Sequence, residues 1–211
     1  MQVTAIADRP LRADAARNAE RILRAAREVY GDLGPDAPVE AIARRAGVGE
    51  RTLYRRFPTK VDLIRAALDQ SIAEDLTPAI EEARVAGDPL RGLAQLIEAA
   101  ISLGAREHNL LTAARRAGFL TPDISTALYE ALDELAERAQ EAGLIRADLV
   151  AEDLPRLIAM LHSVLFTMES GSDGWRRYVA LMLDGITVND REPLPAAAAL
   201  HYAPPSSSWP M

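Results

Sequence analysis

Residues 38–60, PVEAIARRAGVGERTLYRRFPTK, constrain the fold of this chain more than any other segment. Pro38 suits the first position of a helix, where a missing N–H is no loss. Ile42 and Ala46 are four residues apart, so both side chains face the same core. Gly47 can adopt a positive φ and end the helix. The segment therefore begins with a short helix that ends in a tight turn.

A second short helix is predicted over residues 50–57. Leu53 and Phe57 are four residues apart in this helix, so they face inward together. The side chains that remain on the outer face belong to Thr52, Tyr54, Arg55 and Arg56. A short helix that buries its aliphatic side chains and exposes hydroxyls and guanidinium groups suits the major groove of DNA. The spacing thus predicts a DNA-binding helix-turn-helix.

The same segment resembles the motif of the tetracycline-repressor (TetR) family of bacterial transcription regulators. In that motif an IAxxAGV block precedes TLYxxF and a lysine that opens the next helix. The matching residues here are Ile42-Ala43, Ala46-Gly47-Val48, Thr52-Leu53-Tyr54, Phe57 and Lys60. With Arg21-Ile22-Leu23 and Ala26 before them and Leu63-Ile64 after them, the resemblance covers about residues 17–68.

Three positions depart from the family pattern. Gly49 stands where the family often has a serine that caps the second helix, and Arg51 stands where glycine is common. Ala37 replaces a frequent threonine or serine, which leaves Asp36 as the nearest cap for the first helix. The change at Gly49 weakens a cap, whereas Arg51 adds a positive group near the DNA.

The resemblance implies an all-α protein with an N-terminal three-helix DNA-binding head on a larger helical body. It further implies a homodimeric transcriptional regulator, a repressor released from a pseudo-palindromic operator by a small, mostly hydrophobic effector. Two rivals remain open. One is a helical protein that binds or scavenges small molecules and whose head has lost DNA affinity. The other is a helical enzyme, which lacks a recognisable catalytic constellation.

Charge is distributed unevenly along the chain. The net charge is −7, which by itself argues against a nucleic-acid partner. Residues 1–60 nevertheless carry 12 basic and 8 acidic side chains, a net of +4, so the remainder carries −11. Such asymmetry indicates that the N-terminal part meets a polyanion and that the rest does not.

Composition excludes several other classes of protein. There is no cysteine, so neither a disulfide framework nor a thiolate metal site is expected. The N-terminus lacks the apolar core of a signal peptide, and the uncharged run 157–168 has only 12 residues. The uncharged run 193–211 contains five prolines, which a spanning helix would not tolerate. We therefore expect a cytoplasmic protein with no membrane partner.

The chain is expected to divide into four parts. These are a flexible arm at residues 1–13, the helix-turn-helix domain at 14–60, a helical ligand-binding and dimerisation domain at 61–190, and a disordered tail at 191–211. The first helix should span residues 14–32, with a buried stripe formed by Ile22, Ala26, Val29 and Leu33. Thr59, Asp88 and Thr121 are predicted to cap later helices. Body helices are expected over residues 89–106, 109–117, 122–142, 152–169 and 174–189.

Each exposed residue of the second motif helix receives a predicted role. Thr52 and Tyr54 are expected to contact phosphates, Lys60 another phosphate, and Arg55 a base edge. Arg51 and Arg56 are secondary candidates. Two interpretations of the Arg17, Arg21 and Arg24 stripe remain open, a solvated face or a DNA contact. The same holds for Arg9 and Arg12, which either reach a minor groove or make no contact.

No cofactor, metal or catalytic site is predicted. His108, His162 and His201 lack a partner at metal-ligand spacing. Glu81-Glu82 and Asp133-Glu134-Glu137 are acidic runs of the kind that usually form exposed helix faces.

Two further sites are predicted in the body. Two apolar stripes are expected to form a dimer interface, because exposing so much aliphatic surface to water is unfavourable in free energy. They contain Leu154, Leu157, Ile158, Leu161, Leu165 and Met168, and then Trp175, Tyr178, Val179, Met182 and Ile186. The resemblance implies an effector pocket in the body, for which the candidates are His108, Phe119, Tyr129, His162 and Phe166. Each of these five could instead be a packing residue.

Overall fold

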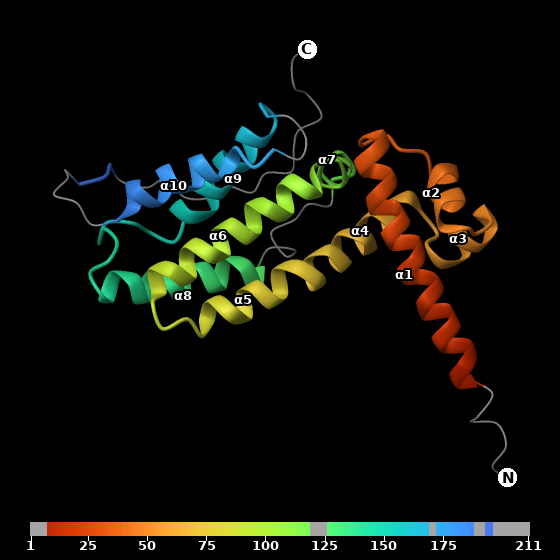
Figure 1. The fold of residues 1–211 in the computed structure, drawn as a ribbon, viewed down its shortest axis with the longest axis horizontal. Coiled ribbons are helices and arrows are strands. Elements are labelled where there is room, and N and C mark those ends of the chain that lie inside the picture. The colour runs from red at the N-terminus through yellow and green to blue at the C-terminus, as the bar shows by residue number, and fades with distance from the viewer. Residues whose placement is uncertain (1–7, 119–125, 169–171, 188–192, 196–211) are drawn as a thin grey trace, which may run out of the picture. The chain divides into compact units, whose positions relative to one another are not determined.

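Helices form nearly all of the regular structure in the computed structural model, which describes residues 8–118, 126–168, 172–187 and 193–195 (Figure 1). An isolated antiparallel bridge joins Ile145 to Thr187. The predicted all-α class is confirmed.

The chain divides into two compact units. Unit 1 contains Met1–Gln70 and Glu107–Phe119, and unit 2 contains Ser71–Arg106 and Leu120–Met211. This division differs from the predicted boundary at residue 60. Most of the helix that follows the motif belongs to unit 1, and so does a short helix that was expected to be part of the body.

Unit 1 is built on one long helix. Its elements are α1 (Asp8–Leu33), α2 (Val39–Ala46), α3 (Glu50–Arg56), most of α4 (Lys60–Ser71) and α7 (His108–Arg116). In α1, Ile22 and Val29 are buried as predicted, and Tyr30 joins them. Leu33 is 57% exposed, because Gly34 adopts a φ of 85° and turns the chain away at that point. The prediction that Leu33 completes the stripe is therefore wrong.

The helix α1 begins earlier than expected. It starts at Asp8, six residues before the predicted start at Asp14, so helix replaces part of the predicted flexible arm. The run LRADAARNAE, residues 11–20, supplies the reason, since alanine and arginine favour a helix. Residues 1–7 lie outside the described part of the chain.

A buried ion pair joins α7 to α1 within unit 1. Arg27 Nε donates a hydrogen bond to Glu107 Oε1 at 2.7 Å, and the Glu107 side chain is only 5% exposed. An exposed pair, Arg116 with Asp36 at 3.0 Å, lies at the other end of α7. These partners are 80 residues apart in sequence. Such contacts explain why residues after Arg106 pack with the N-terminal helices.

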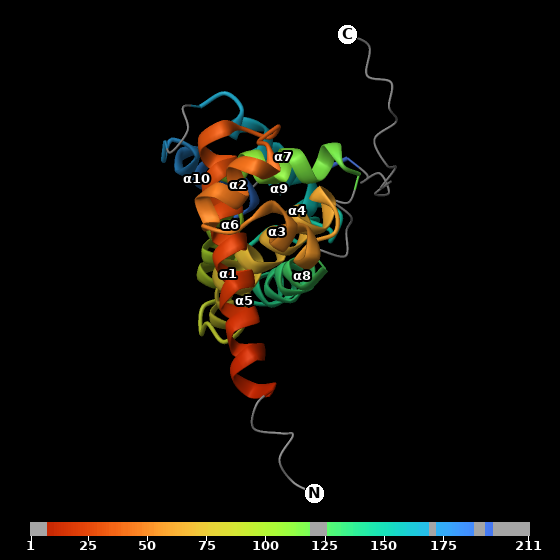
Figure 2. The same ribbon diagram turned by 90° about the vertical axis from the view of Figure 1, so that its right-hand side faces the viewer.

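Unit 2 is a bundle of longer helices. It contains the π-helical turn η1 (Ile72–Leu76), α5 (Thr77–Arg84), α6 (Pro89–Arg106), α8 (Thr126–Glu141), α9 (Asp153–Leu165) and α10 (Trp175–Ile186). The helices α5, α6 and α8 pack side by side, and α9 and α10 pack on α6 (Figures 1 and 2). Gly92 permits the close approach of α6 to α5, because a Cβ there would lie 2.8 Å from the carbonyl oxygen of Ala83.

The predicted helix starts depend on specific caps. The backbone N–H groups of Leu90 and Arg91 donate to Asp88 Oδ1 at 3.0 and 3.2 Å, which confirms the cap before α6. Thr59 and Asp62 bond each other's backbone N–H groups reciprocally at the start of α4, as a capping box requires. The predicted cap at Thr121 falls outside the described residues.

Candidate nucleic-acid interface

The turn between α2 and α3 has the geometry that the sequence predicts. Gly47 lies in the left-handed region, with φ 64° and ψ 36°, and its N–H and that of Val48 bond carbonyls of the last turn of α2. Leu53 and Phe57 are buried, with 1% and 7% exposure. The inner face of α3 is therefore fixed against the rest of unit 1.

The outer face of α3 carries the predicted DNA-contact residues. Arg51, Tyr54, Arg55 and Arg56 are exposed, and Thr52 is half-buried. The Arg56 guanidinium lies 5.9 Å from the centre of the Phe57 ring, within range of a cation–π contact. The structure brings these five side chains onto one short helix, while their individual roles remain predictions.

No side chain caps the start of α3 among the described residues. Gly49 occupies the N-cap position in an extended conformation, and its carbonyl accepts from Thr52 and Leu53. The structure therefore agrees with the weakened cap that the sequence departure at Gly49 implies.

Lys60 begins α4, as the motif requires. Its ammonium lies 5.8 Å from the centre of the Tyr30 ring, which is fully buried. Burial raises the pKa of Tyr30 to about 12, and the nearby Asp36 carboxylate contributes to this rise, so the phenol stays neutral at physiological pH. The ring therefore presents a neutral π-face to the cation. This contact could not be predicted from the sequence, because the whole helix-turn-helix lies between Tyr30 and Lys60.

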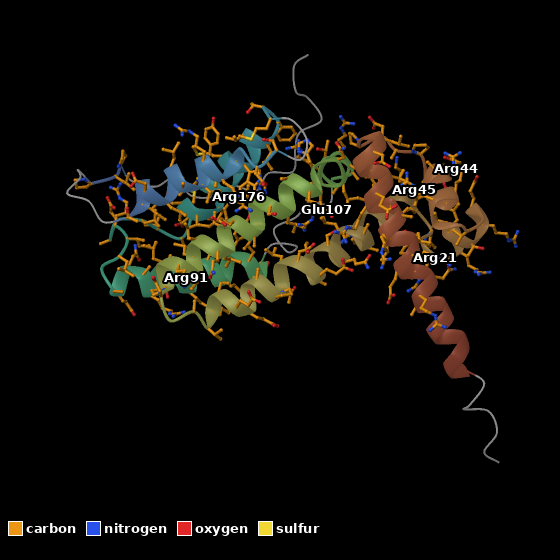
Figure 3. The ribbon with its side chains drawn as sticks, in the orientation of Figure 1. Arg21, Arg44, Arg45, Arg91, Glu107 and Arg176 are labelled. Atoms are coloured by element: carbon orange, nitrogen blue, oxygen red, sulfur yellow. The ribbon has the colours of Figure 1, made fainter. Side chains whose placement is uncertain are left out.

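The two arginines of α2 have different surroundings. Both lie on α2, where Figure 3 labels them. Arg45 is paired with Glu28 at 3.0 Å and with Asp32 at 2.8 Å, both on α1. Arg44 is exposed on the same helix. The positive charge of Arg45 is thus partly neutralised within unit 1, and Arg45 is the weaker candidate of the two for a DNA contact.

A cleft of about 530 Å³ lies next to the start of α3. It is lined by Arg17, Asn18 and Arg21 of α1 and by Gly47, Val48, Gly49 and Thr52 of the motif. Two of the three arginines of the predicted stripe thus border the helix-turn-helix, whereas Arg24 does not line the cleft. The i, i+4 spacing of Arg17 and Arg21 shows from sequence that the two side chains share one face of α1. It does not show that this face borders the motif, so both interpretations of the stripe were left open.

The predicted effector residues are divided between the two units. His108 belongs to unit 1, where burial lowers its pKa and the charge of Arg115 adds to that effect. Tyr129 is half-buried and packs against the core of unit 2, and Phe166 is 53% exposed. Phe119 lies outside the described residues.

His162 packs tightly against another helix of unit 2. A Cβ at Gly104 of α6 would collide with the His162 imidazole, so the ring occupies the space that this glycine leaves. The contact supports the packing interpretation of His162.

Most residues of the predicted dimer stripes pack against the core of unit 2 within the subunit. Leu161, Trp175, Val179 and Ile186 are at most 6% exposed within the subunit. Leu157, Leu165, Met168 and Met182 are half-buried against the same core. Three large apolar side chains of α9 and α10 are exposed, Met160 (65%), Tyr178 (41%) and Leu181 (56%), and of these only Tyr178 belongs to the predicted stripe. Periodicity predicted both helices, but most of the stripe residues that it selected for the interface face inward.

These exposed residues border an apolar groove of about 620 Å³ along α9 and α10. Its apolar lining comprises Leu149, Leu157, Met160, Leu161, Val164, Tyr178, Leu181, Met182, Ile186 and Leu194. A groove of this kind would be covered by an apolar surface more favourably than by water.

The acidic residues do not form a metal cluster. Across the described ranges, no group of three or more His, Asp or Glu side chains is placed to hold a metal ion. Burial raises the pKa of Asp133, and the charges of Glu137 and Glu152 raise it further. Glu134 is engaged in an exposed ion pair with Arg84. No helix in the described part of the chain has the length and apolar character to cross a membrane.

Both units of the structure match models of known protein families. Residues 22–67 match the model of bacterial regulatory proteins of the tetR family. Residues 88–188 match the C-terminal domain of SbtR-like transcriptional regulators. The two matches together span both units of the structure.

Individual relatives agree with this placement. The HTH-type transcriptional regulator Rv2250c of Mycobacterium tuberculosis is 31% identical over 156 residues, which cover 70% of this chain and 78% of that protein. A TetR transcription regulatory protein from Mycobacterium vanbaalenii is 31% identical, with a TM-score of 0.61 over 85% of this chain and 100% of the other. The regulator SCO0520 from Streptomyces coelicolor is also 31% identical, with a TM-score of 0.55 over 80% and 98%.

The structure has the geometry of a helix-turn-helix: α3 has a buried inner face and a basic outer face, and a left-handed turn at Gly47 precedes it. The matching family models and relatives agree with this geometry. The chain therefore belongs to the TetR family of bacterial transcriptional regulators, which bind DNA through a helix-turn-helix.

Proposed function

We propose that this protein is a sequence-specific, ligand-responsive repressor that acts as a homodimer and carries out no catalysis. The observation that carries the proposal is α3 itself. Its buried residues fix the helix, while three arginines, a tyrosine and a threonine face outward from seven residues. A helix of this kind can enter a major groove, where arginine binds guanine in a bidentate manner.

Within this proposal, phosphate contacts set the position of the head and base contacts set its specificity. Tyr54 and Lys60 bind phosphates, Arg55 reads a base edge, and Thr52 provides a hydroxyl to a phosphate. Arg51 and Arg56 extend the basic surface on either side. One head reads few base pairs, so two heads on a pseudo-palindromic operator provide the required specificity.

The second copy of the chain is proposed to cover the apolar groove along α9 and α10. Exposed Met160, Tyr178 and Leu181 would contact the partner, together with half-buried Leu157 and Met182. This assignment keeps Leu157, Tyr178 and Met182 of the predicted stripes and adds Met160 and Leu181, because most of the other stripe residues are buried inside the subunit.

A small, mostly hydrophobic effector is proposed to act on unit 2. Tyr129 and His162 remain candidates for its site, with α6, α8 and α9 as the elements that position them. The effector would reduce DNA affinity by favouring a separation of the two heads that no longer fits successive major grooves. It can shift this equilibrium only by its difference in affinity for the two states.

Footprinting on the DNA upstream of the protein's own gene tests the proposal. We expect protection of two half-sites whose centres are about one helical turn, or a multiple of it, apart. A reporter driven by the same DNA should be more active when the gene is deleted. Lower reporter activity after deletion would indicate an activator, and the absence of any protected site would contradict operator binding.

A further inference from the structure

The cleft between α1 and the helix-turn-helix has the composition of an anion site. Arg17 and Arg21 line one wall, and Thr52 contributes from α3 on the other. No acidic side chain is among the seven residues that line it. Guanidinium groups and a hydroxyl are the side-chain donors that bind phosphate oxygens.

The two arginines are held on the same face of α1. They are four residues apart, which places their side chains one above the other. Arg21 donates a hydrogen bond to Asn18 Oδ1 at 3.0 Å, so a neutral amide orients its guanidinium.

The floor of the cleft is open. A Cβ added at Gly47 or Gly49 would meet nothing within 4 Å. Space therefore remains for a phosphate beside the backbone of the turn at these two glycines. The replacement of the frequent serine by Gly49 removes a hydroxyl from this place, and the arginines of α1 provide donors beside it.

We infer that this cleft binds one backbone phosphate of the DNA in each head, with Arg17, Arg21 and Thr52 as its ligands. The inference rests on the DNA binding proposed above and extends the interface from α3 and Lys60 to α1. It resolves the two open interpretations of the arginine stripe, since Arg17 and Arg21 contact DNA and Arg24 is a solvated residue.

The test uses the full-length protein with Arg17 and Arg21 both changed to Ala. Arg24→Ala is the matched control, because it removes an exposed arginine from the same helix without touching the cleft. Fluorescence anisotropy is measured with labelled duplex from upstream of the gene and with an unrelated duplex of equal length, between 50 and 300 mM KCl. Circular dichroism melts verify that both variants are folded.

We expect the slope of log K against log salt to become shallower by about one unit per bound head in the double variant, because one phosphate contact is lost. Affinity should fall by the same factor on both duplexes, because phosphate contacts are independent of sequence. Arg24→Ala should keep the wild-type slope. Replacement of Arg17 and Arg21 by Lys should restore most of the lost slope, because charge release governs it.

Equal slopes for the double variant and Arg24→Ala would overturn this inference and leave the proposed function intact. If the wild-type protein binds neither duplex, the inference and the proposed function fail together. Calorimetry with inorganic phosphate at constant ionic strength separates the two sources of the anion. A submillimolar Kd that is lost in the double variant, without any change in the DNA slope, would assign the cleft to a free anion instead of DNA.

Discussion

At the scale of single residues, α3 separates the side chains that hold it from those that are available to DNA. Leu53 and Phe57 contact the interior of unit 1, and Arg55 and Tyr54 face outward. This separation was predictable from sequence, because helical periodicity alone assigns positions 53 and 57 to one face. The position of Lys60 over Tyr30 was not predictable, since it depends on how α1 and α4 pack.

Arg55→Ala tests base reading. We expect a loss of about 1–3 kcal/mol in binding to the operator and a much smaller loss on unrelated DNA, because a bidentate contact to a base is removed. Lys60→Ala is the matched phosphate variant and should weaken both complexes equally. Fluorescence anisotropy on both duplexes measures the difference. Equal losses for Arg55→Ala would remove it from base reading and transfer that role to Arg51 or Arg56.

Leu53→Ala tests whether the inner face of α3 is structural. The side chain is 1% exposed, so its truncation should lower the free energy of unfolding by about 2–5 kcal/mol. Arg51→Ala, on the exposed face of the same helix, should change it by less than about 0.5 kcal/mol. Chemical denaturation of the full chain provides both values. A loss below about 1 kcal/mol for Leu53→Ala would contradict the packing described for α3.

At the scale of elements, α7 is part of unit 1 although the chain passes through η1, α5 and α6 before reaching it. Sequence periodicity identified the helix but could not assign it to a unit, because its partners lie 80 residues away. The start of α6, by contrast, was predictable from the local Asp88-Pro89 pair. Helix boundaries that depend on neighbouring residues could therefore be predicted from the sequence. The assignment of a helix to a unit, which depends on contacts between distant residues, could not.

Glu107→Ala tests the buried ion pair that joins α7 to α1. It would leave the Arg27 guanidinium in a site where its side chain is only 19% exposed. Breaking a buried pair in this way should cost about 3–5 kcal/mol of stability. Arg116→Ala breaks the exposed pair at the other end of α7 and should cost less than about 1 kcal/mol. Urea titrations of the two variants should differ in midpoint, and coincident midpoints would argue against a structural role for Glu107.

At the scale of the whole molecule, the proposed homodimer depends on the groove along α9 and α10. Replacing Met160 or Leu181 by glutamate should give folded monomers, because both side chains are more than half exposed in the subunit. Leu161→Glu should instead unfold unit 2, since Leu161 is 6% exposed. Sedimentation velocity distinguishes the cases. Met160→Glu and Leu181→Glu variants that both remain dimeric would place the interface elsewhere.

The proposed function requires that the basic outer face of α3 reads a specific DNA sequence. Fluorescence anisotropy with duplex from upstream of the protein's own gene, against an unrelated duplex of equal length at about 150 mM salt, tests it most directly. We predict that the protein binds the upstream duplex at least about 10³-fold more tightly, as is usual for specific sites. Equal affinity for the two duplexes would contradict it.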